Sequence, residues 1–149
     1  MIPIRTLIVD DHELVRQHTA ALLSAHSDLE VVSVASNGFE AIRIAEESQP
    51  DVVVLDISMP DMNGFQAAPI IKRVAPHTEI LFFSQHDSPF FVREAFAIGA
   101  LGFLTKADAG AHLAEAVRTV HLKRKFLSKN VSGVAALEQV HTKVSANSQ

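Results

Sequence analysis

The chain has 149 residues, a length typical of one compact domain. Hydrophobic residues make up 48% of it, and the formal net charge of −4 argues against a surface that is basic overall and dedicated to nucleic acid. Cysteine is absent, which excludes a disulfide framework and thiolate chemistry and fits a reducing cytoplasm. No apolar stretch reaches the length of a membrane span, so we expect a cytoplasmic protein without membrane contact.

Apolar runs rich in β-branched residues recur along the chain and are expected to form strands. The run at 52–55 is apolar on both faces, which suits a buried parallel strand better than a half-exposed antiparallel one. The predicted strands are residues 6–9, 31–35, 51–55, 79–83 and 101–104.

Apolar residues at helical spacing separate the predicted strands. Residues 63–74 also predict a helix, although Pro69 lies inside it and should kink the helix or delay its start. The other expected inward stripes are Leu14, Ala21, Leu22 and Ala25; Ala41, Ile42 and Ala45; Phe91, Val92, Ala95 and Phe96; and Leu113, Ala116, Val117 and Val120.

The alternation of strands and helices predicts an α/β fold, a doubly wound parallel sheet of five strands with right-handed connections. After about residue 127 the composition turns to Ser, Asn, Val and Gln. We therefore expect a packed domain over residues 1–127 and a tail over residues 128–149 that is partly helical or disordered. The spacing of Val134, Leu137, Val140 and Val144 would allow one short amphipathic helix in the tail.

Charged and hydroxyl residues directly follow the predicted strands. They are Asp10, Asp11, Asp56, Ser84 and Lys106. In an open parallel sheet, ligands collect at the carboxyl ends of the strands. Converging carboxylates repel one another unless a cation joins them, and hard oxygen ligands suit Mg²⁺ or Mn²⁺, not zinc. With one lysine and one hydroxyl added, the set can hold a phosphoryl group.

Each of these acids, taken alone, is also explained as a helix cap or a solvated loop residue. Asp11, for example, stands where it could cap the first helix. For the structural explanation to be right, it would have to apply independently to all five residues, each of which follows a strand. The recurrence of the pattern therefore favours a metal and phosphoryl site.

Four segments of the chain resemble the receiver domains of bacterial two-component response regulators, over about residues 4–125. The segments are residues 7–12, 54–60, 62–64 and 99–106. The resemblance implies a flavodoxin-like sheet with strand order 2-1-3-4-5. Residues 63–106 are similar to receivers of LuxR-type transcription regulators, which continue into a helix-turn-helix domain. No second pair of helices with recognition-helix character is evident in this sequence, so we expect a stand-alone receiver or a fragment of a longer protein.

The resemblance also implies a role for each site residue. Asp56 would accept the phosphoryl group, and Lys106 would pair with the phosphate. Ser84 would be the switch hydroxyl and Phe103 the switch aromatic. The implied metal ligands are Asp10, Asp11, Asp56 and the backbone carbonyl of Ser58.

A sensor histidine kinase is the partner that the resemblance implies, with a downstream protein target that the sequence does not identify. The chain would phosphorylate itself from small phosphodonors and hydrolyse its own acyl phosphate. We expect no nucleic-acid binding by this chain alone, since the basic run at residues 123–125 is explained by a helix C-terminus. Phe90 is expected to be exposed on the fourth helix, and a homodimer is an open alternative.

Three departures from the family pattern concern the output surface. Ala107 follows Lys106 where many receivers carry proline, which leaves the isomer of that peptide bond open. Phe103 lacks the hydroxyl of the tyrosine that many relatives use, and Pro69 is unusual in the third helix.

Rival functions fit the sequence less well. Phosphatases of the haloacid-dehalogenase type need a second aspartate two residues after the nucleophile, where this chain has Ser58. Neither GxGxxG nor GxxxxGK[ST] is present, which disfavours a nucleotide-binding module. A degenerate receiver, which binds partners without phosphorylation, would normally have lost an acid or the lysine. Eight histidines are scattered, and His86 alone is expected near the mouth of the site.

Overall fold

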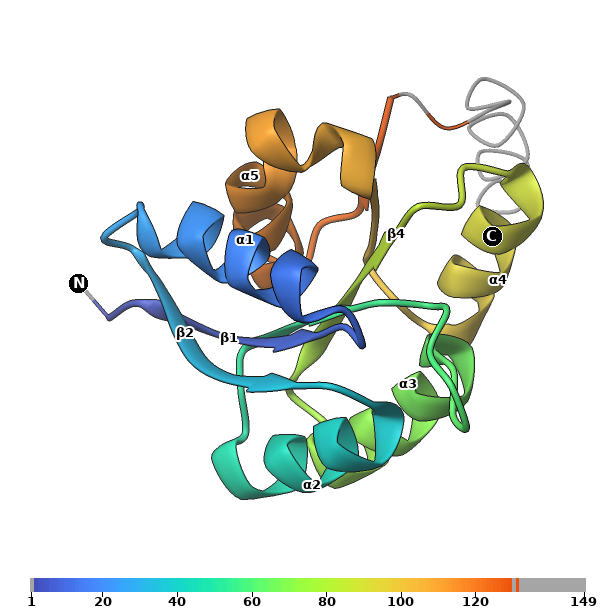
Figure 1. The fold of residues 1–149 in the computed structure, drawn as a ribbon, viewed down its shortest axis with the longest axis horizontal. Coiled ribbons are helices and arrows are strands. Elements are labelled where there is room, and N and C mark those ends of the chain that lie inside the picture. The colour runs from blue at the N-terminus through green and yellow to red at the C-terminus, as the bar shows by residue number, and fades with distance from the viewer. Residues whose placement is uncertain (1, 130, 132–149) are drawn as a thin grey trace, which may run out of the picture.

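A computed structural model describes residues 2–129 and residue 131 of the chain (Figure 1). The strands form one parallel sheet in the order β2-β1-β3-β4-β5-β6. Their bounds are β1 Ile4–Val9, β2 Leu29–Ala35, β3 Val52–Leu55, β4 Glu79–Ser84, β5 Gly102–Thr105 and β6 Phe126–Leu127. The helices are α1 Glu13–Ser24, α2 Gly38–Ser48, α3 Gly64–Val74, α4 Pro89–Ile98, the short 3₁₀ helix η1 Lys106–Asp108 and α5 Ala109–His121.

Helices cover both faces of the sheet: α1 and α5 lie on one face, and α2, α3 and α4 lie on the other (Figure 1). Central strand β3 contributes to both cores. Val53 and Leu55 pack with the helices of the second face, whereas Val52 and Val54 pack with α1 and α5. This two-sided burial confirms that the apolar run is a central parallel strand.

The expected strand order 2-1-3-4-5 is confirmed, and the sheet has one further strand. The two residues of β6 pair in parallel with β5, Phe126 beside Gly102 and Leu127 beside Phe103. Two residues are too few to show a periodic pattern, so the sequence did not indicate this strand.

The segment after β6 remains packed on the domain. Ser128 is buried; its hydroxyl accepts a hydrogen bond from the backbone N–H of Thr105 at 3.0 Å and donates one to Asp108 at 2.7 Å. Val131 is buried in the core on the α2–α4 face. The domain boundary at residue 127 stays a prediction, and the expected tail helix lies outside the described residues.

The predicted inward face of α1 is wrong. Leu14 is 79% exposed, and the buried residues of the helix are Thr19 and Leu23. The hydroxyl of Thr19 donates a hydrogen bond to the carbonyl oxygen of Val15 at 2.7 Å. A threonine whose hydroxyl is paired within its own helix can occupy a buried position, so the apolar pattern alone chose the wrong face.

Helix α3 tolerates its internal proline, and a delayed start is wrong. The helix begins at Gly64 because Asn63 and Gln66 form a reciprocal capping box, with both hydrogen bonds at 2.9 Å. Pro69 lies on the exposed side of the helix. Gly99 ends α4 at φ 108°, in the left-handed region that favours glycine. Among the described helices, none combines the length and the apolar character needed to cross a membrane.

Candidate functional site

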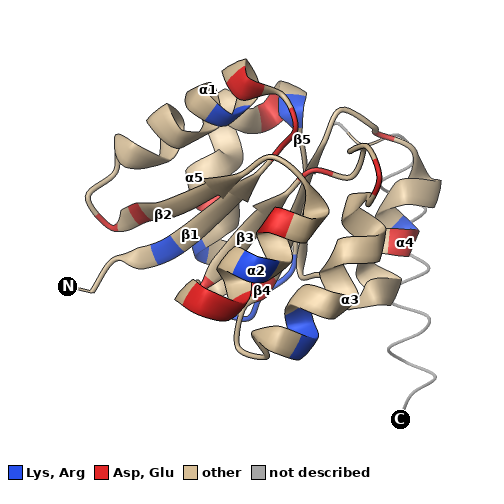
Figure 2. Cartoon of the chain, turned by 60° about the horizontal axis from the view of Figure 1, so that its bottom comes forward, with Lys and Arg blue, Asp and Glu red and all other residues tan. Residues whose placement is uncertain are grey.

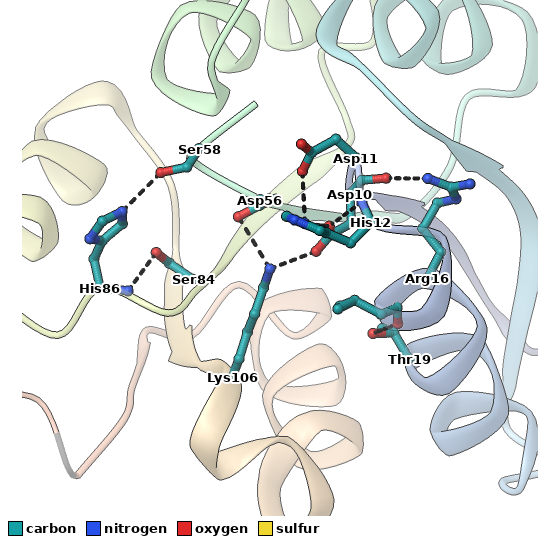
Figure 3. Close-up of polar contacts among 11 residues, drawn as sticks. Asp10, Asp11, His12, Arg16, Thr19, Asp56, Ser58, Ser84, His86 and Lys106 are labelled. Carbon is teal, nitrogen blue, oxygen red and sulfur yellow. Dashed lines mark hydrogen bonds and ion pairs between the residues drawn. The ribbon is translucent and has the colours of Figure 1, made fainter. Parts of the chain in front are cut away.

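The carboxyl ends of β1, β3, β4 and β5 bring the predicted site residues to one edge of the sheet (Figure 3). Asp10 follows β1, Asp56 follows β3, and Lys106 follows β5. The Lys106 ammonium lies 2.7 Å from Oδ2 of Asp10 and 3.5 Å from Oδ1 of Asp56. Both carboxylates are almost fully buried, so a single cation links two acids away from solvent.

The segment that connects β1 to α1 orients the acid pair. The backbone N–H of His12 donates to Oδ1 of Asp10 at 2.9 Å, and Arg16 donates to the carbonyl oxygen of Asp10 at 2.7 Å. The residue that caps α1 is His12, and no side-chain capping bond is present. Asp11 therefore does not cap the helix, and that explanation of Asp11 is wrong.

The electrostatics of Asp56 are unfavourable for a charged carboxylate. Burial, followed by the negative charge of nearby Asp10, raises the pKa of Asp56 to about 6, although the ammonium of Lys106 opposes this rise. The ionised form of Asp56 is therefore disfavoured, and a bound cation would stabilise it.

The acids are suited to a divalent cation. Ligand atoms of Asp10, Asp11, His12 and Asp56 all lie within 4.8 Å of one another. Oδ1 of Asp11 and Oδ2 of Asp10 are buried without an aligned hydrogen-bond partner, although Oδ2 of Asp10 has the ion pair with Lys106. Several buried carboxylate oxygens with spare acceptor capacity match the hard oxygen ligands that Mg²⁺ and Mn²⁺ take.

The backbone of Asp56 is held tightly by the start of α3. The N–H of Asp56 donates to Val9 at 3.0 Å, and the N–H of Gly64 donates to Ile57 at 2.7 Å. A Cβ atom at Gly64 would overlap the carbonyl oxygen of Asp56. Glycine at this position therefore allows the helix to begin directly against the residue that ends β3.

The hydroxyl residues lie on the α4 side of the site. Ser84 is buried, and its hydroxyl accepts a hydrogen bond from the backbone N–H of His86 at 3.0 Å. The His86 ring lies 2.8 Å from the Ser58 hydroxyl and stacks on Phe91 with ring centroids 4.3 Å apart. These contacts form a chain of neighbours from the loop after β3 to helix α4.

The structure thus brings together four predicted residues and leaves others apart. Asp10, Asp11, Asp56 and Lys106 converge, and Ser84 lies beside them (Figure 3). The side chain of Ser58 turns to His86, whereas Phe103 is fully buried in the core. No cis peptide bond occurs in the described part of the chain, so the bond from Lys106 to Ala107 is trans.

Sequence reasoning missed one member of the cluster, His12. Two histidines one helical turn apart are a common sequence signal of histidine ligands, and His12 has no such partner. Its position next to two acids was the available signal, because the turn after a strand folds neighbouring side chains back on one site.

Comparisons with known proteins show which family the chain belongs to. The response regulator receiver domain family matches residues 6–118. The transcriptional regulatory protein LiaR of Bacillus subtilis (strain 168) is 36% identical over 130 residues, which cover 87% of this chain and 62% of LiaR. Response regulator GacA of Pseudomonas viridiflava is 31% identical over 141 residues, which cover 95% of this chain and 66% of GacA. The chain therefore spans about two thirds of the length of these relatives or less.

Solved structures show the same fold. A LuxR-family two-component response regulator from Aurantimonas sp. SI85-9A1 has a TM-score of 0.86 at 32% identity, with 93% of this chain and 99% of that chain covered. One chain of the CheX–CheY–BeF₃–Mg²⁺ complex from Borrelia burgdorferi has a TM-score of 0.74 at 25% identity, with 80% of this chain and 90% of that chain covered. The chain belongs to the receiver domain family of two-component response regulators, and its function is that of a phosphoacceptor switch.

Proposed function

We propose that Asp56 accepts a phosphoryl group from the phosphohistidine of a sensor histidine kinase, with Mg²⁺ or Mn²⁺ as cofactor. The observation that carries this proposal is the position of Asp56, a buried carboxylate at the end of β3 that shares the Lys106 ammonium with Asp10 and clusters with the acid pair. The proposed metal ligands are Asp10, Asp11, Asp56 and the backbone carbonyl of Ser58.

In the transfer, a carboxylate oxygen of Asp56 attacks phosphorus in line while the bond from phosphorus to the histidine nitrogen breaks. Asp56 must be ionised to attack, and the ammonium of Lys106, 3.5 Å away, favours that state. Lys106 is also placed to neutralise an equatorial oxygen of the phosphoryl group. The bound cation supplies further positive charge to the phosphoryl oxygens.

The switch is proposed to act through Ser84, which would bond to the phosphoryl oxygens. Its hydroxyl already accepts a hydrogen bond from the backbone N–H of His86, so movement of Ser84 would shift the loop before α4. Phe103, the proposed switch aromatic, is fully buried in this structure. A switch in which the Phe103 ring turns into the space that Ser84 vacates would need the ring to start outside the core, so the response is proposed to pass through the Ser84–His86 segment.

We further propose that the protein acts in the cytoplasm and transmits its phosphorylation state by contact with another protein. Phe90 on α4 is 61% exposed, as expected, and offers an apolar anchor to an unidentified downstream protein. Resetting by hydrolysis of the acyl phosphate belongs to the same proposal. Self-association through the tail is the alternative output.

The test is phosphorylation from acetyl phosphate and Mg²⁺, followed by intact mass spectrometry. We expect one added phosphoryl group, loss of the addition in Asp56→Asn, and suppression by EDTA. Asp61→Asn is the matched control, because Asp61 is exposed and its φ of 69° suits asparagine. Equal labelling of the Asp56→Asn variant would refute the assignment.

A further inference from the structure

The imidazole of His12 faces the same acids that the proposed metal site uses. Its Nδ1 lies 3.1 Å from Oδ1 of Asp11 and 3.3 Å from Oδ1 of Asp10 (Figure 3). A ring that merely capped α1 or turned to solvent would not approach both carboxylates. The nitrogen therefore belongs to the same group of potential ligands.

The contact between His12 and Asp11 is short but is not an aligned hydrogen bond. Oδ1 of Asp11 is buried and has no hydrogen-bond partner, even though Nδ1 lies 3.1 Å away. Two neighbouring ligands of an octahedral ion, each about 2.1 Å from it, lie about 3.0 Å apart. The observed separation matches that edge, so the two atoms are spaced as adjacent ligands of one ion.

The ring can turn to a cation without loss of a helix cap, because its Nδ1 is hydrogen-bonded not to the helix backbone but to Oδ1 of Asp10, at 3.3 Å. His12 occupies the N-cap position of α1, yet its side chain makes no capping bond. The ring is 67% exposed, whereas Asp10 beneath it is buried. A cation on the buried acids would therefore meet the imidazole on its outer side, at a position otherwise filled by water.

We propose that His12 is an additional metal ligand through Nδ1, which shifts the preference of this site from Mg²⁺ toward ions that bind imidazole well, such as Ni²⁺. The proposal rests on the proposed function, which places a divalent cation on the acid cluster. Mg²⁺ prefers oxygen ligands and retains its water, whereas imidazole nitrogen binds the transition metals.

The first test compares the affinities of the untagged full chain for Mg²⁺ and Ni²⁺ by isothermal titration calorimetry. His12→Phe keeps a planar ring and removes both nitrogens. We expect this variant to bind Ni²⁺ at least about tenfold more weakly, the size of effect known for residues around metal sites. Binding of Mg²⁺ should change by less than about twofold, because the oxygen ligands remain.

The matched control is His18→Phe, since His18 is exposed on the same helix and is not one of the four clustered residues. It should change neither affinity. A second measurement does not depend on a variant: pulsed EPR of the Mn²⁺ complex of the natural chain should show ¹⁴N coupling from one imidazole.

Three results would overturn the inference: equal weakening of Mg²⁺ and Ni²⁺ in His12→Phe, no ¹⁴N coupling in the natural chain, or coupling that persists in His12→Phe. In each case Mg²⁺-dependent addition of a phosphoryl group to Asp56 would still support the proposed function. Failure of that addition, together with absent Mg²⁺ binding, would instead count against the cluster as a metal site.

Discussion

Ionised Asp56 should lower the free energy of unfolding of the metal-free protein, because its carboxylate is buried. Its pKa is raised to about 6, chiefly by burial, so the folded protein binds a proton at Asp56 more tightly than the unfolded chain does. The resulting stability is present below about pH 4, the ordinary range of aspartate, and is lost as the pH rises through the folded pKa. At neutral pH the buried charge therefore destabilises the fold.

We predict that Asp56→Asn is more stable than the natural chain in EDTA at pH 7.5, by about 1–3 kcal/mol. The physical reason is that the amide replaces an ionised carboxylate whose pKa is raised to about 6. Thermal unfolding should show a higher Tm for the variant, and the difference should shrink at pH 5, where Asp56 is protonated. Asp61→Asn should show no such change. A difference that does not vary with pH would contradict the role of the buried charge.

Among the elements, α3 supports the site through Gly64. A side chain there would overlap the backbone of Asp56, so the helix would have to move or β3 would have to yield. We predict that Gly64→Ala lowers the free energy of unfolding by about 1–3 kcal/mol, as in other overpacked positions. Urea unfolding measures this loss, and slower labelling by acetyl phosphate should accompany it because Asp56 shifts.

Gly110→Ala is the control for the same change of residue. Gly110 lies in the first turn of α5, and a Cβ there meets nothing within 4 Å. Alanine is the better helix former, so this variant should be unchanged or more stable by up to about 1 kcal/mol. A loss of stability equal to that of Gly64→Ala would mean that the close approach to Asp56 is not the cause.

Helix α4 should report the state of the site through Ser84 and His86. A ligand shifts a conformational equilibrium only by its different affinities for the two states. Beryllofluoride with Mg²⁺, a mimic of the phosphoryl group, should therefore perturb the NMR signals of α4 and β5. Ser84→Ala should weaken this response and leave metal binding largely intact, whereas Ser24→Ala, at the far end of α1, should not. Changes limited to the loops around Asp10 and Asp56 would argue against the switch.

The parts of the fold and site that were predictable are those with local signals. A strand buried on both faces is a run of apolar residues, and the charged residues that follow the strands are visible one by one, so the parallel sheet and the cluster of Asp10, Asp56 and Lys106 were expected. The strand order has no local signal and was expected only from the resemblance to receiver domains. The two residues of β6 are too short to show a pattern. The buried face of α1 depended on an internal hydrogen bond of Thr19, and the place of His12 depended on a turn whose geometry the sequence does not show.

For the whole molecule, the distribution of charge bears on nucleic acid. In the view of Figure 2, basic residues on α2 and α4 lie beside acidic ones. In the basic run after α5, Lys123 pairs with Glu79 at 2.7 Å, and Lys125 lies over the ring of Phe96. DNA affinity requires several unpaired cations on one face, because each neutralised phosphate releases counterions.

We predict that these 149 residues alone form no complex with mixed duplex DNA in a mobility-shift assay at physiological salt. Beryllofluoride should not change this result. Sedimentation of the same samples should reveal whether activation alters self-association instead. A sequence-selective DNA complex would contradict the prediction.

The buried residue Ser128 should limit how far the chain can be truncated without loss of stability. Its hydroxyl joins Thr105 and Asp108, which flank Lys106 in the chain, and Val131 fills part of the core. A truncation after residue 127 removes these contacts, and we expect it to cost about 2 kcal/mol or more of stability from the lost burial and hydrogen bonds. A truncation after residue 131 keeps these contacts, so it should have a higher Tm than the truncation after residue 127.

The hydrogen bonds of Ser128 also connect the phosphorylation site to the segment after β6. Ser128 is hydrogen-bonded to residues on both sides of Lys106, so a shift of that lysine toward a phosphoryl group would also pull on Ser128. A fluorophore attached to exposed Lys129, the residue after Ser128, would thus move with the site, and one attached to exposed Ile2 would not.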